Sequence, residues 1–252
     1  MNQPANRNRI PLRFALLSGL CVLATGLGAA AEQPGIIPVD EIRPGMKGQA
    51  KTVFAGREVE SFDLEVLGVL RNFLGPKQDI ILVRLLGPRV SYTGVVGGMS
   101  GSPVYLDGRL AGALSLRFGI FTKEPIAGVT PITSMLRAAD QTASGPVADA
   151  EFPVRYLLPE AAAGSLGLPA ASQAYLVPIE TPLALSGFHP QAIGRFAEEL
   201  GRYGFVAVPG GTASGSPDQA APLEPGGAVS AALITGDLNL AGTCTVTLRE
   251  GD

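Results

Sequence analysis

The chain has 252 residues, including 33 glycines and 21 prolines; 16% of residues are charged, tryptophan is absent and the formal net charge is −3. A chain of this length can bury a sizeable core in one or two domains, and this composition favours short strands joined by tight turns over a helical bundle. So small a net charge, without a basic stripe, gives no basis for a nucleic-acid partner.

The first 31 residues have the features of an export signal. Three arginines precede an apolar run over residues 14–24, and small residues at 29–31 stand before Glu32. A positive start, an apolar centre and a small-residue end are typical of a cleavable signal peptide. We therefore expect cleavage after Ala31, export to the periplasm, cell envelope or medium, and no membrane span after cleavage. An uncleaved anchor is the alternative, because the apolar stretch over 14–31 approaches spanning length.

Within residues 36–86, hydrophobic and polar residues follow a pattern that is typical of strands. Phe62, Leu64 and Val66 alternate with polar residues, and residues 79–86 form a nearly continuous apolar run. The first pattern predicts a strand with one buried face, and the second predicts a central strand. Further along the chain, a short amphipathic helix is predicted at residues 133–139.

The most distinctive stretch is residues 97–113, GGMSGSPVYLDGRLAGA. Glycines flank Ser100 and let backbone amides turn inward without Cβ clashes, while Asp107 and Gly108 between two apolar runs predict a tight β-hairpin. Chymotrypsin-like barrels present their nucleophilic serine on such a turn. The pattern therefore indicates Ser100 as a nucleophile, with the N–H groups of Gly98 and Ser100 as the oxyanion hole. The alternative is a turn that only joins two strands.

The remainder of the chain divides into a connection and a second β-rich part. Residues 141–174 are rich in Ala, Gly, Pro and Ser, which is typical of a linker or a loosely packed connection. The elements predicted beyond it are a helix at 190–203 and strands at 174–179, 228–234 and 242–248. A second Ser-Gly-Ser-Pro at 214–217 lacks a following apolar run and is predicted to be a flexible loop.

Thiols and metal ligands are scarce. The cysteines are Cys21, inside the predicted signal, and Cys244, and the one histidine is His189. A single cysteine in the mature chain cannot form an internal disulfide, and a distant His–Cys pair gives no zinc-type cluster. The sequence has no phosphate-binding loop and no dinucleotide fingerprint. We therefore expect no metal and no cofactor, and a buried structural thiol at Cys244.

Four blocks in the sequence, in this order, resemble the SpoIVB-type serine peptidase domain of bacteria. They are residues 43–48, 61–70, 92–113 and 123–132. The resemblance covers about residues 36–140 well and the stretch from 223 onward more loosely. It implies a peptidase of the chymotrypsin-like superfamily, with Ser100 matching the family's nucleophile.

A serine hydroxyl needs a neighbouring general base, most often a histidine. His189 stands just before the predicted helix, which indicates a capping or surface role. The resemblance agrees, because the family's catalytic histidine follows a glycine, whereas His189 follows Phe188. In related sequences a segment like residues 242–247 continues through a turn into a strand with this Gly-His motif. This sequence stops at Asp252, so we expect a truncated form that lacks its base.

The acid of a catalytic triad is left open by the sequence. No carboxylate stands where some relatives place the triad aspartate, in the segment before the nucleophile. Asp63, Asp79 and Asp237 remain candidates, and a strand-edge or turn role explains each of them equally well.

Together these features predict a mainly β protein with a chymotrypsin-like barrel and a few short helices, incomplete at its C-terminus. The expected regions are a signal peptide (1–31), a SpoIVB-like peptidase core (32–140), a connection (141–174) and a second β-rich part with one helix (175–252). The predicted function is an exported serine endopeptidase that acts on a protein or peptide and is inactive or weak in this form. The alternatives are a non-catalytic envelope module, whose glycine-rich turn binds a peptide or anion, and a structural scaffold. The oligomeric state is left open.

Overall fold

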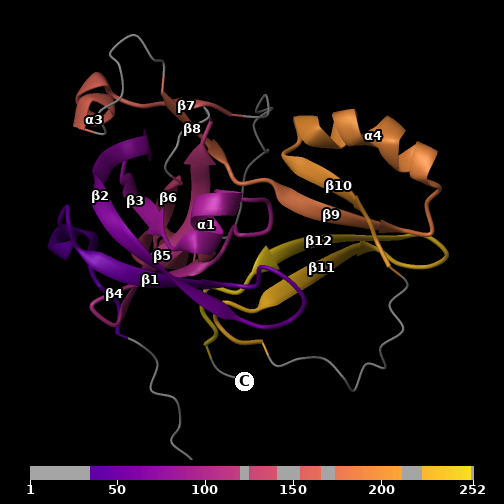
Figure 1. Ribbon diagram of the computed structural model, residues 1–252, viewed down its shortest axis with the longest axis horizontal. Coiled ribbons are helices and arrows are strands. Elements are labelled where there is room, and N and C mark those ends of the chain that lie inside the picture. Colours follow the sequence, from indigo (N-terminus) through magenta and orange to yellow (C-terminus); the bar gives the residue numbers. More distant parts are fainter. Residues whose placement is uncertain (1–34, 120–124, 141–153, 166–173, 212–222, 251–252) are drawn as a thin grey trace, which may run out of the picture. The chain divides into compact units, whose positions relative to one another are not determined.

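Six antiparallel strands close into a barrel (Figure 1). They are β1 (Lys47–Thr52), β2 (Glu60–Gly75), β3 (Gln78–Leu86), β4 (Pro103–Leu106), β5 (Arg109–Phe118) and β6 (Ile126–Pro131). The strands follow the order β4-β1-β2-β3-β6-β5, and β4 also pairs with β5, which completes the ring. The mainly β, chymotrypsin-like barrel expected from the sequence is thereby confirmed.

The computed structural model describes residues 35–119, 125–140, 154–165, 174–211 and 223–250. All of them belong to one compact unit, Pro34–Asp252. The predicted signal peptide, most of the predicted connection and the predicted loop at 214–217 lie outside these described residues.

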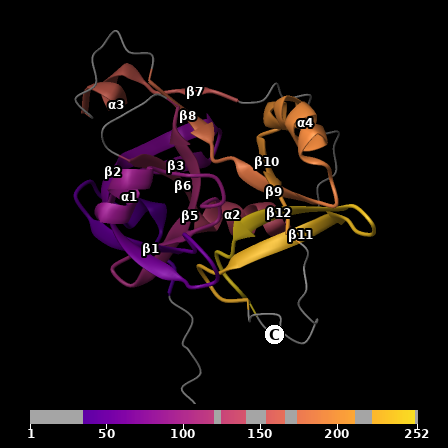
Figure 2. The ribbon, with the colours of Figure 1, turned by 45° about the vertical axis from the view of Figure 1, so that its right-hand side comes forward.

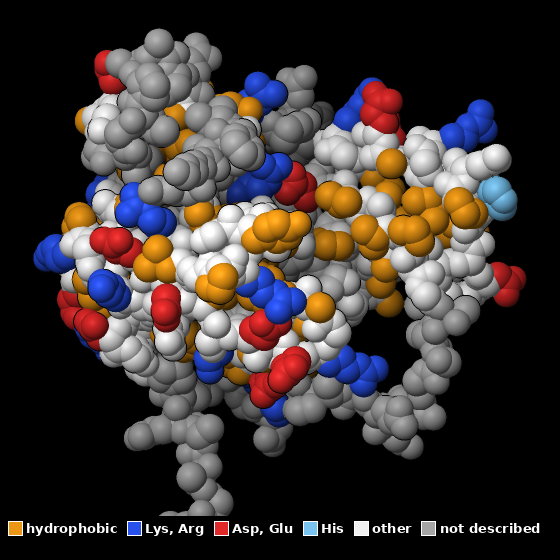
Figure 3. Space-filling model, viewed as in Figure 1, with side chains coloured by type: hydrophobic (Ala, Val, Ile, Leu, Met, Phe, Trp, Pro, Cys, Tyr) orange, Lys and Arg blue, Asp and Glu red, His pale blue; other side chains and the backbone are white. Residues whose placement is uncertain are grey.

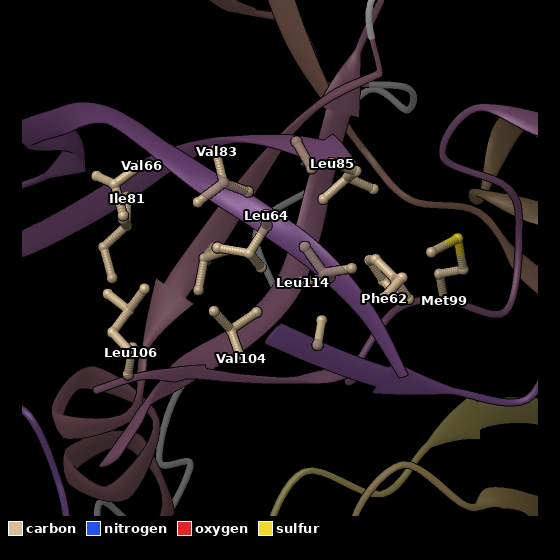
Figure 4. Close-up of a cluster of buried hydrophobic side chains, with 14 of the residues drawn as sticks. Phe62, Leu64, Val66, Ile81, Val83, Leu85, Met99, Val104, Leu106 and Leu114 are labelled. Carbon is tan, nitrogen blue, oxygen red and sulfur yellow. The ribbon is translucent and has the colours of Figure 1, made fainter. Parts of the chain in front are cut away.

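The barrel core follows from the alternation seen in the sequence. On β2, Phe62, Leu64 and Val66 are buried while Asp63 between them is exposed, and the buried side chains meet those of β3 and β4 inside the barrel (Figure 4). The outer face of β3 is also buried, in a second cluster that includes Ile80. Burial on both faces explains the continuous apolar run at residues 79–86 and confirms its prediction as a central strand.

The predicted hairpin after the Ser100 motif is present. Asp107 and Gly108 have φ values of 49° and 73°, and they join β4 to β5 through the pair Leu106–Arg109. Positive φ at both central residues is the geometry of a type I′ turn, whose twist matches that of the flanking strands. The hairpin places β4, and therefore the loop before it, at a fixed position on the barrel.

Among the described residues, helices are few and short, as expected. They are η1 (Val39–Glu41), α1 (Pro88–Thr93), α2 (Ile132–Asp140), α3 (Glu160–Ser165) and α4 (Pro190–Arg202). α2 and α4 confirm the two predicted helices. α1 is absent from the sequence-based predictions: Pro88 occupies its first turn, and Gly94, with a φ of 69°, follows its last residue.

The barrel sheet continues beyond β5. β8 (Tyr175–Pro178) pairs with β5, and β7 (Tyr156–Leu157) pairs with β8 at the edge. β8 confirms the strand predicted at 174–179, whereas β7 and α3 fall in the region predicted to be a connection.

A second sheet of four strands follows in the chain. Its strands are β9 (Thr181–Ser186), β10 (Phe205–Pro209), β11 (Ala228–Ile234) and β12 (Asn239–Thr245), in the order β10-β9-β12-β11. β9 and β10 are parallel, with α4 as the connection between them, and α4 lies over this sheet (Figure 2). Ile193 of α4 packs against Leu183 and Leu185 of β9. This α4-facing side of the sheet is a small core separate from the barrel.

The second sheet buries less of its apolar surface than the barrel does. Hydrophobic side chains gather in a row over the sheet below α4 (Figure 3). The large hydrophobic residues of this part that are exposed are Phe196, Tyr203, Val206, Leu233, Ile234 and Leu238.

Candidate active site

The Ser100 loop, residues 97–102, lies between α1 and β4. Gly98 and Gly101 have φ values of 92° and 90°, a conformation that favours glycine. Met99 is 2% exposed and packs into the barrel core, and the Gly101 amide donates to the Leu114 carbonyl at 2.9 Å. These contacts pin the loop to the barrel and leave Ser100 partly exposed, with no hydrogen bond from its hydroxyl to any described residue.

Residues of β12 and the segment after it hold the same loop from the other side. The Thr245 amide donates to the Ser100 carbonyl at 2.9 Å. The Thr245 hydroxyl donates to the Gly98 carbonyl at 2.9 Å, and the Thr247 hydroxyl donates to the Gly101 carbonyl at 2.6 Å. The second sheet is therefore part of the site, although nothing in the spacing of these residues pointed to it.

The two expected oxyanion-hole amides differ in their surroundings. The Ser100 amide has no acceptor among the described residues, whereas the Gly98 amide donates to the Glu180 carbonyl at 3.1 Å. The Glu180 side chain in turn accepts from Arg117 Nε at 2.9 Å. This hydrogen bond lowers the pKa of the Glu180 carboxyl below its usual range, so the pair stays ionised near neutral pH. The ion pair with Arg117 thus holds Glu180 in place, and with it the carbonyl that accepts from the Gly98 amide.

His189 caps α4, as the sequence indicated. Its Nδ1 atom accepts a hydrogen bond from the Gln191 amide at 3.3 Å. β9 ends at Ser186, which pairs with Asn239 at the start of β12, while Thr245 at the far end of β12 contacts Ser100. Six residues of extended strand span about 20 Å. His189 is therefore too far from Ser100 to take its proton.

We expect the His189→Ala variant to leave any reaction of Ser100 within a few-fold of the parent chain. Loss of the cap should lower the free energy of unfolding by about 1 kcal/mol or less, because the hydrogen bond is long and exposed. Fluorophosphonate labelling and a urea melt measure the two effects. A drop in labelling of about a thousandfold, the scale of a lost triad base, would overturn this assignment.

Two of the three candidate aspartates have structural partners, and the third lies in an exposed turn. Asp63 accepts from Gln49 on the outer face of the barrel, and Asp79 accepts from Arg71 at the β2–β3 hairpin. Asp237 is exposed in the turn between β11 and β12, at the opposite end of β12 from the Ser100 loop. The strand-edge and turn roles considered for them therefore suffice.

The remaining predictions concern Cys244 and metals. The Cys244 thiol is free and only half-buried, so the expectation of a buried thiol is wrong; β12 lies beside an exposed edge strand that leaves it partly open. Within the described ranges, no three His, Cys, Asp or Glu side chains gather into a group that could hold a metal ion.

A cleft beside the Ser100 loop is a feature that the sequence did not reveal. It has a volume of about 280 Å³ and is bordered by residues from the β1–β2 connection, the Ser100 loop and the second sheet. Because these segments are distant in sequence, only the fold shows that they share one cavity.

Comparison with known proteins gives a match to a protein family. Residues 31–136 match the family described as SpoIVB peptidase S55, a range that spans all six barrel strands and the Ser100 loop. No curated protein and no solved structure matches the chain. Among the helices that the structure describes, none has the length and apolar character needed to cross a membrane.

Proposed function

Since residues 31–136 match the SpoIVB serine peptidase family, we propose that this chain cleaves protein or peptide substrates by acyl transfer through Ser100. The observation that carries the proposal is the presentation of Ser100. Its hydroxyl is accessible and unpaired among the described residues, on a glycine turn pinned to a closed barrel. The Ser100 Oγ would attack the substrate carbonyl carbon, and the amine of the cleaved bond would leave with a proton.

The oxyanion would form next to the amides of Ser100 and Gly98. The Ser100 amide is available for this role, and the Gly98 amide would exchange its bond to Glu180 for one to the substrate oxygen. A donor of this kind contributes about a hundredfold to a thousandfold in rate. We propose that substrate binding brings about this exchange.

The general base has to come from elsewhere than His189, the one histidine of the sequence. We infer that a histidine base, where the peptidase uses one, is supplied from outside these 252 residues. The chain by itself would then keep only the weak activity that oxyanion stabilisation and binding provide.

We also propose that the protein is exported, on the basis of the signal-like residues 1–31. The expected N-terminus of the exported protein is Glu32, which mass spectrometry of the periplasmic or secreted fraction measures. Intact Met1 in the membrane fraction would instead indicate an uncleaved anchor.

The activity is tested by labelling with a fluorophosphonate, which reacts with activated serines. The 252-residue chain and the same chain extended by its natural downstream sequence are compared, and the labelled peptide is mapped. We expect strong labelling at Ser100 in the extended protein and little in the shorter one. Equally strong labelling of the shorter chain would show that a base lies within it, and no labelling of either protein would overturn the peptidase proposal.

A further inference from the structure

We propose that the cleft beside the Ser100 loop, which we call the apolar cleft, binds an uncharged, apolar side chain of the substrate. This side chain would belong to the residue whose carbonyl Ser100 attacks, so the inference rests on the proposed function and adds the substrate class to it.

The first observation that supports this proposal is the position of the apolar cleft next to Ser100. Residues 96–99, which line the apolar cleft, lead directly into Ser100. Thr245, which also lines it, donates its amide to the Ser100 carbonyl. When the carbonyl carbon of a substrate residue lies against the Ser100 hydroxyl, the side chain of that residue would therefore reach this cleft.

The second support is the chemistry of the walls. No Lys, Arg, His, Asp or Glu lines the apolar cleft, and its side chains include those of Val53, Phe54 and Pro182. The two hydroxyl groups that line it are already paired. Thr245 Oγ1 donates to the Gly98 carbonyl at 2.9 Å, and Thr243 Oγ1 lies 2.9 Å from Ser230 Oγ. A charged side chain placed here would lose water without gaining a partner, whereas an apolar one gains by burial.

The third support is size and shape. A volume of about 280 Å³ leaves room for a side chain such as leucine, methionine or phenylalanine. The wall beside Ser100 is made by glycines: a Cβ on Gly98 would lie 3.4 Å from Pro182 Cγ. Without side chains at Gly97 and Gly98, a substrate backbone can approach the loop closely.

The pairing of the strands explains why the cleft is open. Leu183 and Leu185 of β9 face α4, so Pro182, next to Leu183 in the strand, faces the opposite side of the sheet. Thr243, Thr245 and Ala228 share that side, because Ala228 pairs with Thr245. The apolar cleft therefore lies on the face of the second sheet that α4 does not cover.

The test separates binding from catalysis by using the Ser100→Ala variant of the full chain. Three fluorescein-labelled peptide amides that differ only in a C-terminal Leu, Lys or Glu are titrated, with fluorescence anisotropy as the readout. We expect the Leu peptide to bind at least about tenfold more tightly than the other two. Equal affinities, or no binding of any peptide, would overturn the inference.

A second variant tests the location. Adding Ala228→Asp places a carboxylate at the apolar cleft, and we expect it to weaken binding of the Leu peptide and strengthen binding of the Lys peptide, each about tenfold. Ala232→Asp is the matched control, because Ala232 is exposed on the same face of β11 but does not line the cleft. An equal effect of both substitutions, or none from either, would contradict the location.

The outcomes also distinguish this inference from the proposed function. Selective binding of the Leu peptide without fluorophosphonate labelling of the extended protein would support the apolar cleft as a peptide-binding site and contradict the proposed peptidase function. Labelling at Ser100 without selectivity among the peptides would support the proposed peptidase function and contradict the role of the apolar cleft in its specificity.

Discussion

Ser100→Ala is expected to abolish fluorophosphonate labelling of the extended protein, and Ser102→Ala is expected to leave it intact. The two serines lie in the same loop, but the Ser102 side chain is fully buried, at 0% exposed, whereas Ser100 is partly exposed. The reagent can therefore reach only Ser100. The expected loss for a missing nucleophile is about a thousandfold or more, which intact-mass spectrometry measures.

Ser102→Ala is a matched control because its effect on the fold should be small. The Ser102 hydroxyl has no hydrogen-bond partner in the part of the chain that the structure describes, and removing an unsatisfied buried hydroxyl costs little or is favourable. A thermal melt should thus show both variants folded. If Ser102→Ala loses its label while its melting temperature is unchanged, the assignment of Ser100 as nucleophile is wrong.

Gly101→Ala is expected to detach the Ser100 loop from the residues of β12. A Cβ at Gly101 would overlap the carbonyl oxygen of Thr245, and the φ of 90° is unfavourable for alanine. The backbone strain costs about 1–2 kcal/mol, and the hydrogen bonds made by Thr245 and Thr247 are worth about 1 kcal/mol each. We expect the free energy of unfolding to fall by about 3 kcal/mol or more, measured by urea denaturation, and the extended protein to lose its labelling at Ser100.

Gly108→Ala separates the effect of backbone strain from the effect of the collision between the new Cβ and the Thr245 carbonyl. Gly108 has a φ of 73° but open space where a Cβ would lie, so this variant carries the backbone strain without the collision. We expect it to cost about 1–2 kcal/mol and to keep Ser100 reactive. If Gly101→Ala is no more destabilising than Gly108→Ala, the contact between the loop and β12 does not position Ser100.

Local patterns in the sequence were enough to predict much of the barrel. Three patterns depend only on residues that are close together in the sequence. They are the alternation at Phe62, Leu64 and Val66, the apolar run at residues 79–86 and the turn at Asp107. The same holds for the cap at His189, because a cap contacts the first turn of its own helix. Ser100 could be singled out as a candidate because the glycines that shape its loop are its neighbours in sequence.

The second sheet could not be predicted in this way. β9 and β10 pair in parallel across α4, and β12 spans Asn239–Thr245 instead of residues 242–248, because its pairing with β9 sets its first residues. Beyond β12, Thr247 turns its hydroxyl to the Ser100 loop and leaves the ladder. The Gly98–Glu180 hydrogen bond and the apolar cleft also depend on these long-range pairings, which no local pattern records.

The contacts of the Ser100 loop have a consequence for the order of events during protein synthesis. The residues joined by the Thr245 and Thr247 hydroxyls lie 147 and 146 positions apart in the chain. At a synthesis rate of about 5–20 residues per second, the second partner leaves the ribosome about 7–30 seconds after the first. During that interval the nascent chain carries Ser100 in a loop that lacks the hydrogen bonds made by Thr245 and Thr247. Ser100 therefore reaches its final setting only after β12 and Thr247 have been synthesised.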